Sequence, residues 1–180
     1  MDPTAREGRV ASAALGRLRT SGYALTTLAE IASAAGLSEA ELSAAFGAKN
    51  EILAELAAPL LTRLNEVLDA ACTADLLRPD QLRGVLESYH DALVEHRLLV
   101  EVILRDPTAG SSDAVVAVRA GLIRLRDELA TGTGDDLDHH RVRAASALGA
   151  VQGAVLDLTD VDPTAVRDEA VTAAIAILLS

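Results

Sequence analysis

The sequence predicts an all-α fold of about nine helices, and composition and helical spacing are the two observations that predict it. Half of the 180 residues are hydrophobic but only 2% are aromatic, so the core has to consist of aliphatic side chains. The chain is rich in alanine and leucine, which favour helix because they lose little rotamer freedom there. Apolar residues also recur three and four positions apart along most of the chain, as one face of a helix requires.

The first 50 residues predict three short helices with clear start and stop signals. The first helix covers about residues 4–19 and stops at Gly22. Two capping boxes, residues 27–30 (Thr-Leu-Ala-Glu) and 38–41 (Ser-Glu-Ala-Glu), begin the next two helices, because hydroxyl and carboxylate together satisfy free amides of the first turn. Residues 35–37 leave room only for a sharp corner, which is a helix-turn-helix spacing.

The rest of the chain predicts longer helices. Residues 98–104 are almost continuously apolar and, taken alone, also suit a buried strand, but their helical surroundings offer no strand partner. The predicted helices cover residues 48–73, 79–96, 98–104, 113–130 and 137–158, with a last helix from Asp162–Pro163 to the C-terminus.

Three details qualify this pattern of helices. Pro59 lacks a backbone N–H, so we expect a kink or a short break there. The glycine-rich stretch 131–134 is expected to be a turn between two helices. The last helix is apolar on nearly every side over residues 170–179, and part of its cover is therefore expected from a second subunit.

Charge places a boundary near residue 50 and limits the class of protein. Residues 1–50 carry five basic and five acidic side chains, whereas residues 51–180 carry 11 and 22, so the whole net charge of −11 lies in the second part. Such acidity argues against a protein whose whole surface binds nucleic acid or anionic membranes. It does not exclude a local surface that binds DNA. No apolar run approaches the roughly 20 residues of a membrane span, and no signal peptide is visible, so a cytoplasmic protein is expected.

An ordered set of residues in the N-terminal third resembles the TetR family of transcriptional regulators. The resemblance covers about residues 5–55 and implies a helix-turn-helix DNA-binding domain over 1–50 and a helical ligand-binding and dimerisation domain over 51–180. It also implies a homodimer formed by the last two helices, a palindromic double-stranded DNA operator and an unknown small-molecule effector. The matching residues are Gly22-Tyr23-Ala24-Leu25-Thr26-Thr27-Leu28-Ala29-Glu30-Ile31-Ala32, Ala35-Gly36-Leu37-Ser38, Leu42, Phe46, Lys49 and Ile52-Leu53.

By this resemblance, residues 39–46 form the recognition helix that enters a major groove. Thr27, at a helix N-terminus, suits a phosphate, and Lys49 is placed to contact one. The helix departs from the family pattern, which usually has a basic residue at the position of Glu39 and a tyrosine at the position of Ser43. A glutamate at the first of these positions can instead accept a hydrogen bond from cytosine. The predicted DNA-contacting residues are Thr26, Thr27, Ser38, Glu39, Glu41, Ser43, Ala44 and Lys49.

The expected function is that of a transcriptional regulator, specifically a repressor that a small-molecule effector releases from DNA. The alternative is a helical dimer of the same fold that has lost operator binding and serves as a ligand- or protein-binding module, as the acidic recognition helix suggests. No catalytic motif in the sequence supports an enzyme, and the sequence predicts no catalytic residue and no cofactor.

Candidate ligand and metal residues lie in the second part of the chain. Tyr89, His90 and Gln152 are the candidate polar anchors of an effector pocket with an aliphatic lining, which favours an aliphatic or amphipathic effector. Glu87, His90 and Asp91 share one helical face and suit a divalent metal, but an exposed polar face is the preferred interpretation, so no metal site is predicted. Cys72 is expected to be a small buried apolar group.

Overall fold

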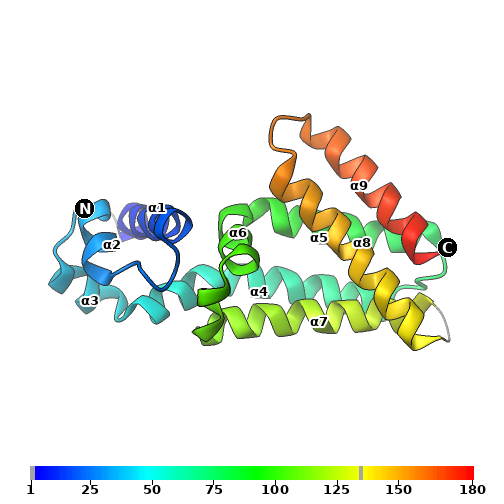
Figure 1. The fold of residues 1–180 in the computed structure, drawn as a ribbon, viewed down its shortest axis with the longest axis horizontal. Coiled ribbons are helices and arrows are strands. Elements are labelled where there is room, and N and C mark those ends of the chain that lie inside the picture. Colours follow the sequence, from blue (N-terminus) through cyan, green and yellow to red (C-terminus); the bar gives the residue numbers. More distant parts are fainter. Residues whose placement is uncertain (1–2, 134–135) are drawn as a thin grey trace. The chain divides into compact units, whose positions relative to one another are not determined.

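The computed structural model describes residues 3–133 and 136–180, and all regular structure within them is helical (Figure 1). The all-α fold class is therefore confirmed. The elements are α1 (Pro3–Ser21), α2 (Leu28–Ala35), α3 (Glu39–Phe46), α4 (Lys49–Thr73), α5 (Pro79–Glu95), α6 (Arg97–Arg105), the 3₁₀ helix η1 (Pro107–Ser111), α7 (Asp113–Thr133), α8 (Leu137–Asp157) and α9 (Pro163–Leu178).

Two ambiguous segments of the sequence are resolved as helix. The apolar run 98–104 lies within α6, so the strand alternative is not realised. Helix α4 continues through Pro59, so the break considered there does not occur. A proline removes one backbone hydrogen bond, and burial of apolar side chains on both sides of it, including Ala57 and Leu60, holds the helix together.

The predicted turn at residues 131–134 was wrong for its first three residues. Helix α7 continues to Thr133, whose hydroxyl donates to the carbonyl of Leu129 at 2.7 Å; Gly134 lies outside the described residues. Gly132 allows Leu76 to pack closely against α7 and does not form a turn. A Cβ added to it would lie 3.1 Å from Cγ and 3.2 Å from Cβ of the buried Leu76. A glycine in a helix therefore signals close approach here.

The chain divides into two compact units, which are described separately. The N-terminal unit comprises Met1–Pro59 and Leu98–Ala117, and the C-terminal unit comprises Leu60–Arg97 and Val118–Ser180. The sequence pattern placed the boundary near residue 50. The segment that contains α6, η1 and the start of α7 groups with the N-terminal unit, although about 40 residues of sequence separate it from the rest.

In the N-terminal unit, α1, α2 and α3 pack around one small core together with the start of α4. Gly22, with a φ of 79°, ends α1, and Gly36, with a φ of 70°, makes the corner between α2 and α3. Glycine adopts this left-handed conformation without steric penalty. The core consists of Val10, Ala14, Ile31, Ala32, Ala35, Leu42 and Ile52.

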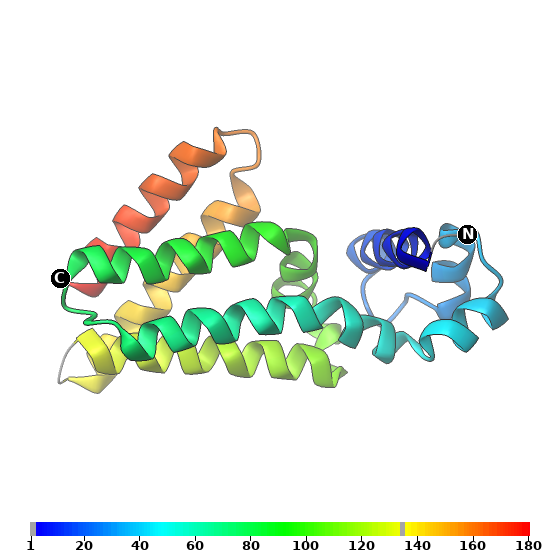
Figure 2. The same cartoon turned by 180° about the vertical axis from the view of Figure 1, so that it is seen from behind.

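In the C-terminal unit, α8 and α9 lie side by side and α5 packs against both (Figures 1 and 2). Arg83 of α5 also donates to the hydroxyl of Thr172 of α9 at 3.0 Å. From Ala165 onward, the exposed residues of α9 are small or acidic: Ala165, Asp168, Glu169, Thr172, Ala173 and Ala176. None of the described helices is long and apolar enough to span a membrane.

Candidate nucleic-acid interface

Two complete capping boxes fix the starts of α2 and α3. The hydroxyl of Thr27 accepts from the N–H of Glu30 at 3.2 Å, while the Glu30 carboxylate accepts from the N–H of Thr27 at 2.8 Å. Ser38 and Glu41 repeat this arrangement with distances of 3.2 and 2.8 Å. The local sequence therefore determines where both helices begin, because each box satisfies amides that have no partner inside the helix.

Helix α3 is attached to the N-terminal unit by one buried side chain. Leu42 is fully buried in the core below it, whereas most of the other residues of the helix are exposed. The exposed residues are Glu39, Ala40, Glu41, Ser43, Ala44 and Ala45. The helix thus presents a broad outer surface of small and acidic side chains.

The predicted DNA-contacting residues separate into exposed and internal ones. Thr27, Ser38, Glu39, Glu41, Ser43 and Ala44 are exposed. Thr26 is only 2% exposed, and its hydroxyl donates to the carbonyl of Gly22 at 2.7 Å. Its side chain therefore holds the turn before α2.

Lys49 is half-buried and braces the turn between α1 and α2. Its ammonium donates to the carbonyl of Tyr23 at 2.5 Å and to that of Thr26 at 2.7 Å, and it lies 4.1 Å from the centre of the Tyr23 ring. Partial burial lowers the pKa of Lys49, an effect that Asp106 opposes. An ammonium has three donors, so these two hydrogen bonds leave one donor for another partner.

Sequence reasoning missed the residues that hold this turn from the other side. The carboxylate of Asp106 accepts from the N–H of Tyr23 at 2.5 Å, and the hydroxyl of Thr108 accepts from the N–H of Ala24 at 3.1 Å. The Tyr23 hydroxyl donates to Asn50. No local pattern could show that Asp106 bonds a partner 83 residues away.

The pH dependence of this clamp follows from its hydrogen bonds. Desolvation raises the pKa of Asp106, but hydrogen bonds from the Thr108 side chain and from the N–H groups of Tyr23 and Thr108 outweigh it, and the net pKa is lowered. The carboxylate therefore contributes stability above the unfolded-state pKa of about 3.9, which is lost as pH falls through the folded-state pKa. We expect Asp106→Asn to reduce the free energy of unfolding at pH 7, and the deficit to shrink below about pH 4.

Urea unfolding of both proteins between pH 7 and pH 2.5 measures this effect. Glu169→Gln is the control, since Glu169 is exposed and forms no ion pair with the described residues. A deficit that stays constant down to pH 2.5 would exclude a role for the ionised carboxylate.

The acidic groups of the helix-turn-helix segment differ in their partners. Hydrogen bonds from the N–H and hydroxyl of Thr27 lower the pKa of Glu30, and hydrogen bonds from the hydroxyl and N–H of Ser38 lower that of Glu41. Both carboxylates therefore remain charged and belong to the caps. Arg6 of α1 donates to the carbonyl of Glu41 at 3.2 Å, which connects α1 to α3.

The structure brings together two of the three predicted ligand anchors. The Gln152 amide donates to the hydroxyl of Tyr89 at 2.6 Å, and burial raises the pKa of this fully buried tyrosine. His90 lines a cavity of about 110 Å³ between α5, α8 and α9, together with Arg97 and a mainly aliphatic wall. Its Nδ1 lies 3.1 Å from Asp91.

The face of α5 that suits a metal is occupied by an arginine. Arg167 of α9 bonds Asp91 at 2.9 and 3.0 Å and lies 3.5 Å from Glu87. A cation already neutralises both carboxylates, so this face works as an ion pair between α5 and α9. No group of three potential ligands with metal-binding geometry occurs in the described part of the chain.

The expectation that Cys72 is buried was wrong, because its side chain lies on the exposed face of α4. The buried position next to it is Ala71. Desolvation, followed by the nearby carboxylates of Glu128 and Asp69, raises the pKa of the thiol. A raised pKa disfavours the reactive thiolate.

Comparisons with known proteins agree with this geometry. Residues 11–56 match the model of a family described as bacterial regulatory proteins, tetR family. No curated protein matches the chain. The matched residues include α2, α3 and the first part of α4.

Solved structures resemble the chain over nearly its whole length. A TetR-like transcriptional regulator from Rhodococcus sp. RHA1 has a TM-score of 0.71 at 22% identity, covering 97% of this chain and 96% of its own. The TetR family regulator PfmR from Thermus thermophilus has a TM-score of 0.67 at 21% identity, with coverages of 94% and 97%. NalD, the secondary repressor of the MexAB-OprM multidrug efflux pump in Pseudomonas aeruginosa, has a TM-score of 0.69 at 14% identity, with coverages of 97% and 96%. Identities this low establish a shared fold.

Proposed function

We propose that this chain, whose residues 11–56 match the tetR family model and whose fold is that of TetR-like regulators, represses transcription by binding a DNA operator through α3 and leaves the DNA when a small molecule binds. The observation that carries this proposal is the outward face of α3, a helix whose one buried side chain is Leu42 and whose start is fixed by a complete capping box. An α-helix with one exposed side fits the width of the major groove.

The side chains on this face suit contacts with base edges. Ser43 can donate to or accept from either strand, and the methyl group of Ala44 suits the methyl group of thymine. Glu39 has a carboxylate that can accept from the amino group of cytosine. Short side chains also allow the helix backbone to approach the groove floor closely.

Phosphate contacts are proposed to come mainly from backbone amides. The hydroxyl and N–H of Thr27 both donate to Glu30, so they are available to a phosphate only if that carboxylate moves. The N–H groups of Leu28 and Ala29 have no partner among the described residues, and a helix N-terminus favours an anion. The third donor of Lys49 adds one positive charge.

A homodimer is proposed to present two such helices to a palindromic operator. The small exposed side chains on the second half of α9, Ala173 and Ala176 among them, support an interface formed by α8 and α9. A two-fold axis places paired recognition helices in successive major grooves. Such a regulator acts in the cytoplasm, where the DNA lies.

The effector is proposed to bind the cavity that His90 and Arg97 line in the C-terminal unit. Its aliphatic wall includes Val94, Val155 and Val166, and its volume of about 110 Å³ suits only a small aliphatic or amphipathic molecule, or the end of a longer one, whose polar group meets the imidazole and the guanidinium. The effector can release the DNA only through a difference in its affinity for the two states of the dimer.

The test of DNA binding is fluorescence polarisation with the DNA that flanks the protein's own gene, at several salt concentrations. Glu39→Lys is expected to tighten binding to all sequences and to steepen the dependence of log K on log salt by about 0.9, the value of one added phosphate contact. Glu39→Gln is the matched control and is expected to leave that slope unchanged. The Glu39→Gln variant is also expected to distinguish a C·G pair from other base pairs less well at one operator position, because each good base contact contributes about 1–3 kcal/mol.

A failure of the wild-type protein to bind selectively at low salt and micromolar concentration would overturn the proposal. It would favour the module that has lost operator binding. An unchanged salt slope in Glu39→Lys would place α3 away from the DNA.

A further inference from the structure

The N-terminal unit contains a hollow that the proposed function does not use. It has a volume of about 430 Å³ and lies between α1, the end of α3 and the start of α4. An adjoining hollow shares Glu7, Phe46 and Glu55 with it, so the two form one groove. Small residues on α1 open this space: the wall includes Gly8 and Ala11, and a Cβ added to Gly8 would meet no atom within 4 Å.

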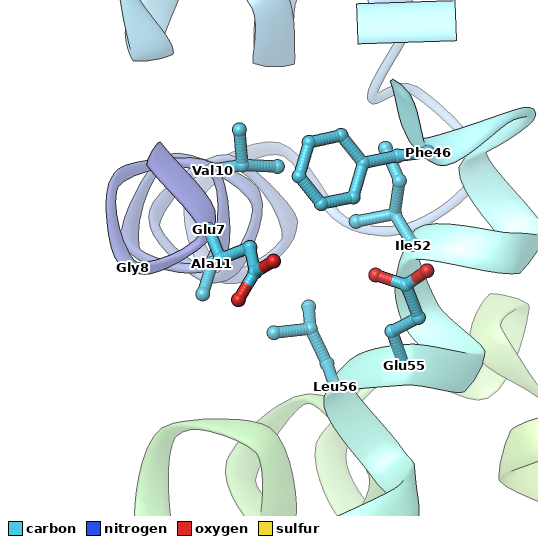
Figure 3. Close-up of a pocket in the computed structure, with 8 residues that line it drawn as sticks. All are labelled: Glu7, Gly8, Val10, Ala11, Phe46, Ile52, Glu55 and Leu56. Carbon is cyan, nitrogen blue, oxygen red and sulfur yellow. The ribbon is translucent and has the colours of Figure 1, made fainter. Parts of the chain in front are cut away.

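The floor of the groove is apolar and incompletely covered. Val10 and Ile52 belong to the core, and the side chains of Phe46 and Leu56 pack against that core while staying half-buried. Figure 3 shows the Phe46 ring facing Val10 across the hollow, with Ile52 and Leu56 on the α4 side. An occupant with an apolar part would remove this surface from water.

The mouth of the groove is negatively charged. The carboxylates of Glu7, from α1, and Glu55, from α4, point toward each other across the opening (Figure 3). Neither forms an ion pair with a cationic side chain in the described part of the chain. Arg6, which lines the adjoining hollow, donates instead to the Glu41 carbonyl. Two like charges facing each other favour a cation between them.

We propose that this groove is a second ligand site, in the DNA-binding unit itself, and that its ligand is an organic cation with an apolar tail. The ammonium group would lie between Glu7 and Glu55, and the tail would cover Phe46 and Leu56. Aromatic faces also attract ammonium groups. Because the groove touches the last residue of α3, the ligand bears directly on the recognition helix, whereas the proposed effector cavity lies in the C-terminal unit.

The experiment is isothermal titration calorimetry of the full-length protein without DNA, so its outcome does not depend on operator binding. The probe is octyltrimethylammonium, and 1-octanol and octane-1-sulfonate are its neutral and anionic matches. One cation is expected to bind per chain with a Kd of about 1 mM or below, the range for a ligand of this size. The neutral match should bind about tenfold more weakly, and the anion should not bind.

Three variants locate the site. The double change Glu7→Gln and Glu55→Gln is expected to weaken the cation about tenfold and to leave 1-octanol unaffected. Ala11→Leu fills the groove and is expected to abolish binding, while Ser12→Leu, at an exposed neighbouring position outside the lining, is expected to bind like the wild type. Thermal unfolding tests whether each variant is folded. If Ala11→Leu does not fold, the double variant of Glu7→Gln and Glu55→Gln still tests the proposal.

Several outcomes would overturn the proposal. Equal affinity for cation and anion would show that Glu7 and Glu55 do not select the ligand, and unaltered binding in Ala11→Leu would place the probe elsewhere. A change of oligomeric state in Ala11→Leu but not in Ser12→Leu, measured by analytical ultracentrifugation, would assign the groove to a second copy of the chain.

Discussion

Leu42→Ala is expected to destabilise the N-terminal unit by about 2–5 kcal/mol, the usual result of truncating a fully buried leucine. Leu42 is 0% exposed and is the one buried residue of α3, packed with Ile31 of α2 and Val10 of α1 in a small core. A small core has few other contacts to compensate for a cavity. The variant should therefore lose DNA binding through local unfolding of α3.

Hydrogen exchange and thermal unfolding measure this loss. Ser43→Ala is the matched control, because Ser43 is the exposed neighbour on the same helix. We expect Ser43→Ala to change the free energy of unfolding by less than about 0.5 kcal/mol and still to reduce DNA affinity. Equal stability of Leu42→Ala and Ser43→Ala would mean that Leu42 does not anchor α3.

Lys49→Met is expected to reduce the free energy of unfolding by about 1.5–3 kcal/mol, the range for hydrogen bonds to a charged group. The change keeps the aliphatic stem but removes the hydrogen bonds to the carbonyls of Tyr23 and Thr26 and the contact with the Tyr23 ring. The turn before α2 then loses its brace on the α4 side. Urea unfolding measures the change.

The same variant separates the structural role of Lys49 from a role in DNA binding. If the third donor meets a phosphate, the dependence of log K on log salt flattens by about one unit. Lys49→Arg keeps the charge and is expected to keep the slope. Reduced stability with an unchanged slope would leave Lys49 as a brace only, and unchanged stability would contradict the role of its two carbonyl contacts.

Local patterns predicted the helix-turn-helix well for a physical reason. A capping box joins groups three residues apart, so Thr27 with Glu30 and Ser38 with Glu41 could be recognised without knowing the rest of the fold. The strand-like run 98–104 was also assigned correctly, because no strand partner existed elsewhere in the sequence. Gly132 was misread as part of a turn, since a glycine that admits a neighbour has the same sequence signal as one that ends a helix.

The candidate site was predicted less completely, because function depends on which partner each polar group finds. Thr26 resembled a DNA contact by its position but bonds the Gly22 carbonyl, and Cys72 resembled a core residue but lies on an exposed face. Tyr89 and Gln152 were named together as anchors, and their mutual hydrogen bond supplies each with a partner.

The sequence by itself predicted the existence of the nine described α-helices, the capping boxes at Thr27 and Ser38 and the corner at Gly36, since these depend on contacts within a few residues. The tertiary structure alone decided that Asp106 and Lys49 hold the turn before α2 from two sides, that Arg167 neutralises Asp91, and that small residues on α1 leave a groove beside α3. Such contacts join residues that are tens of positions apart, and only the folded chain brings them within hydrogen-bonding distance.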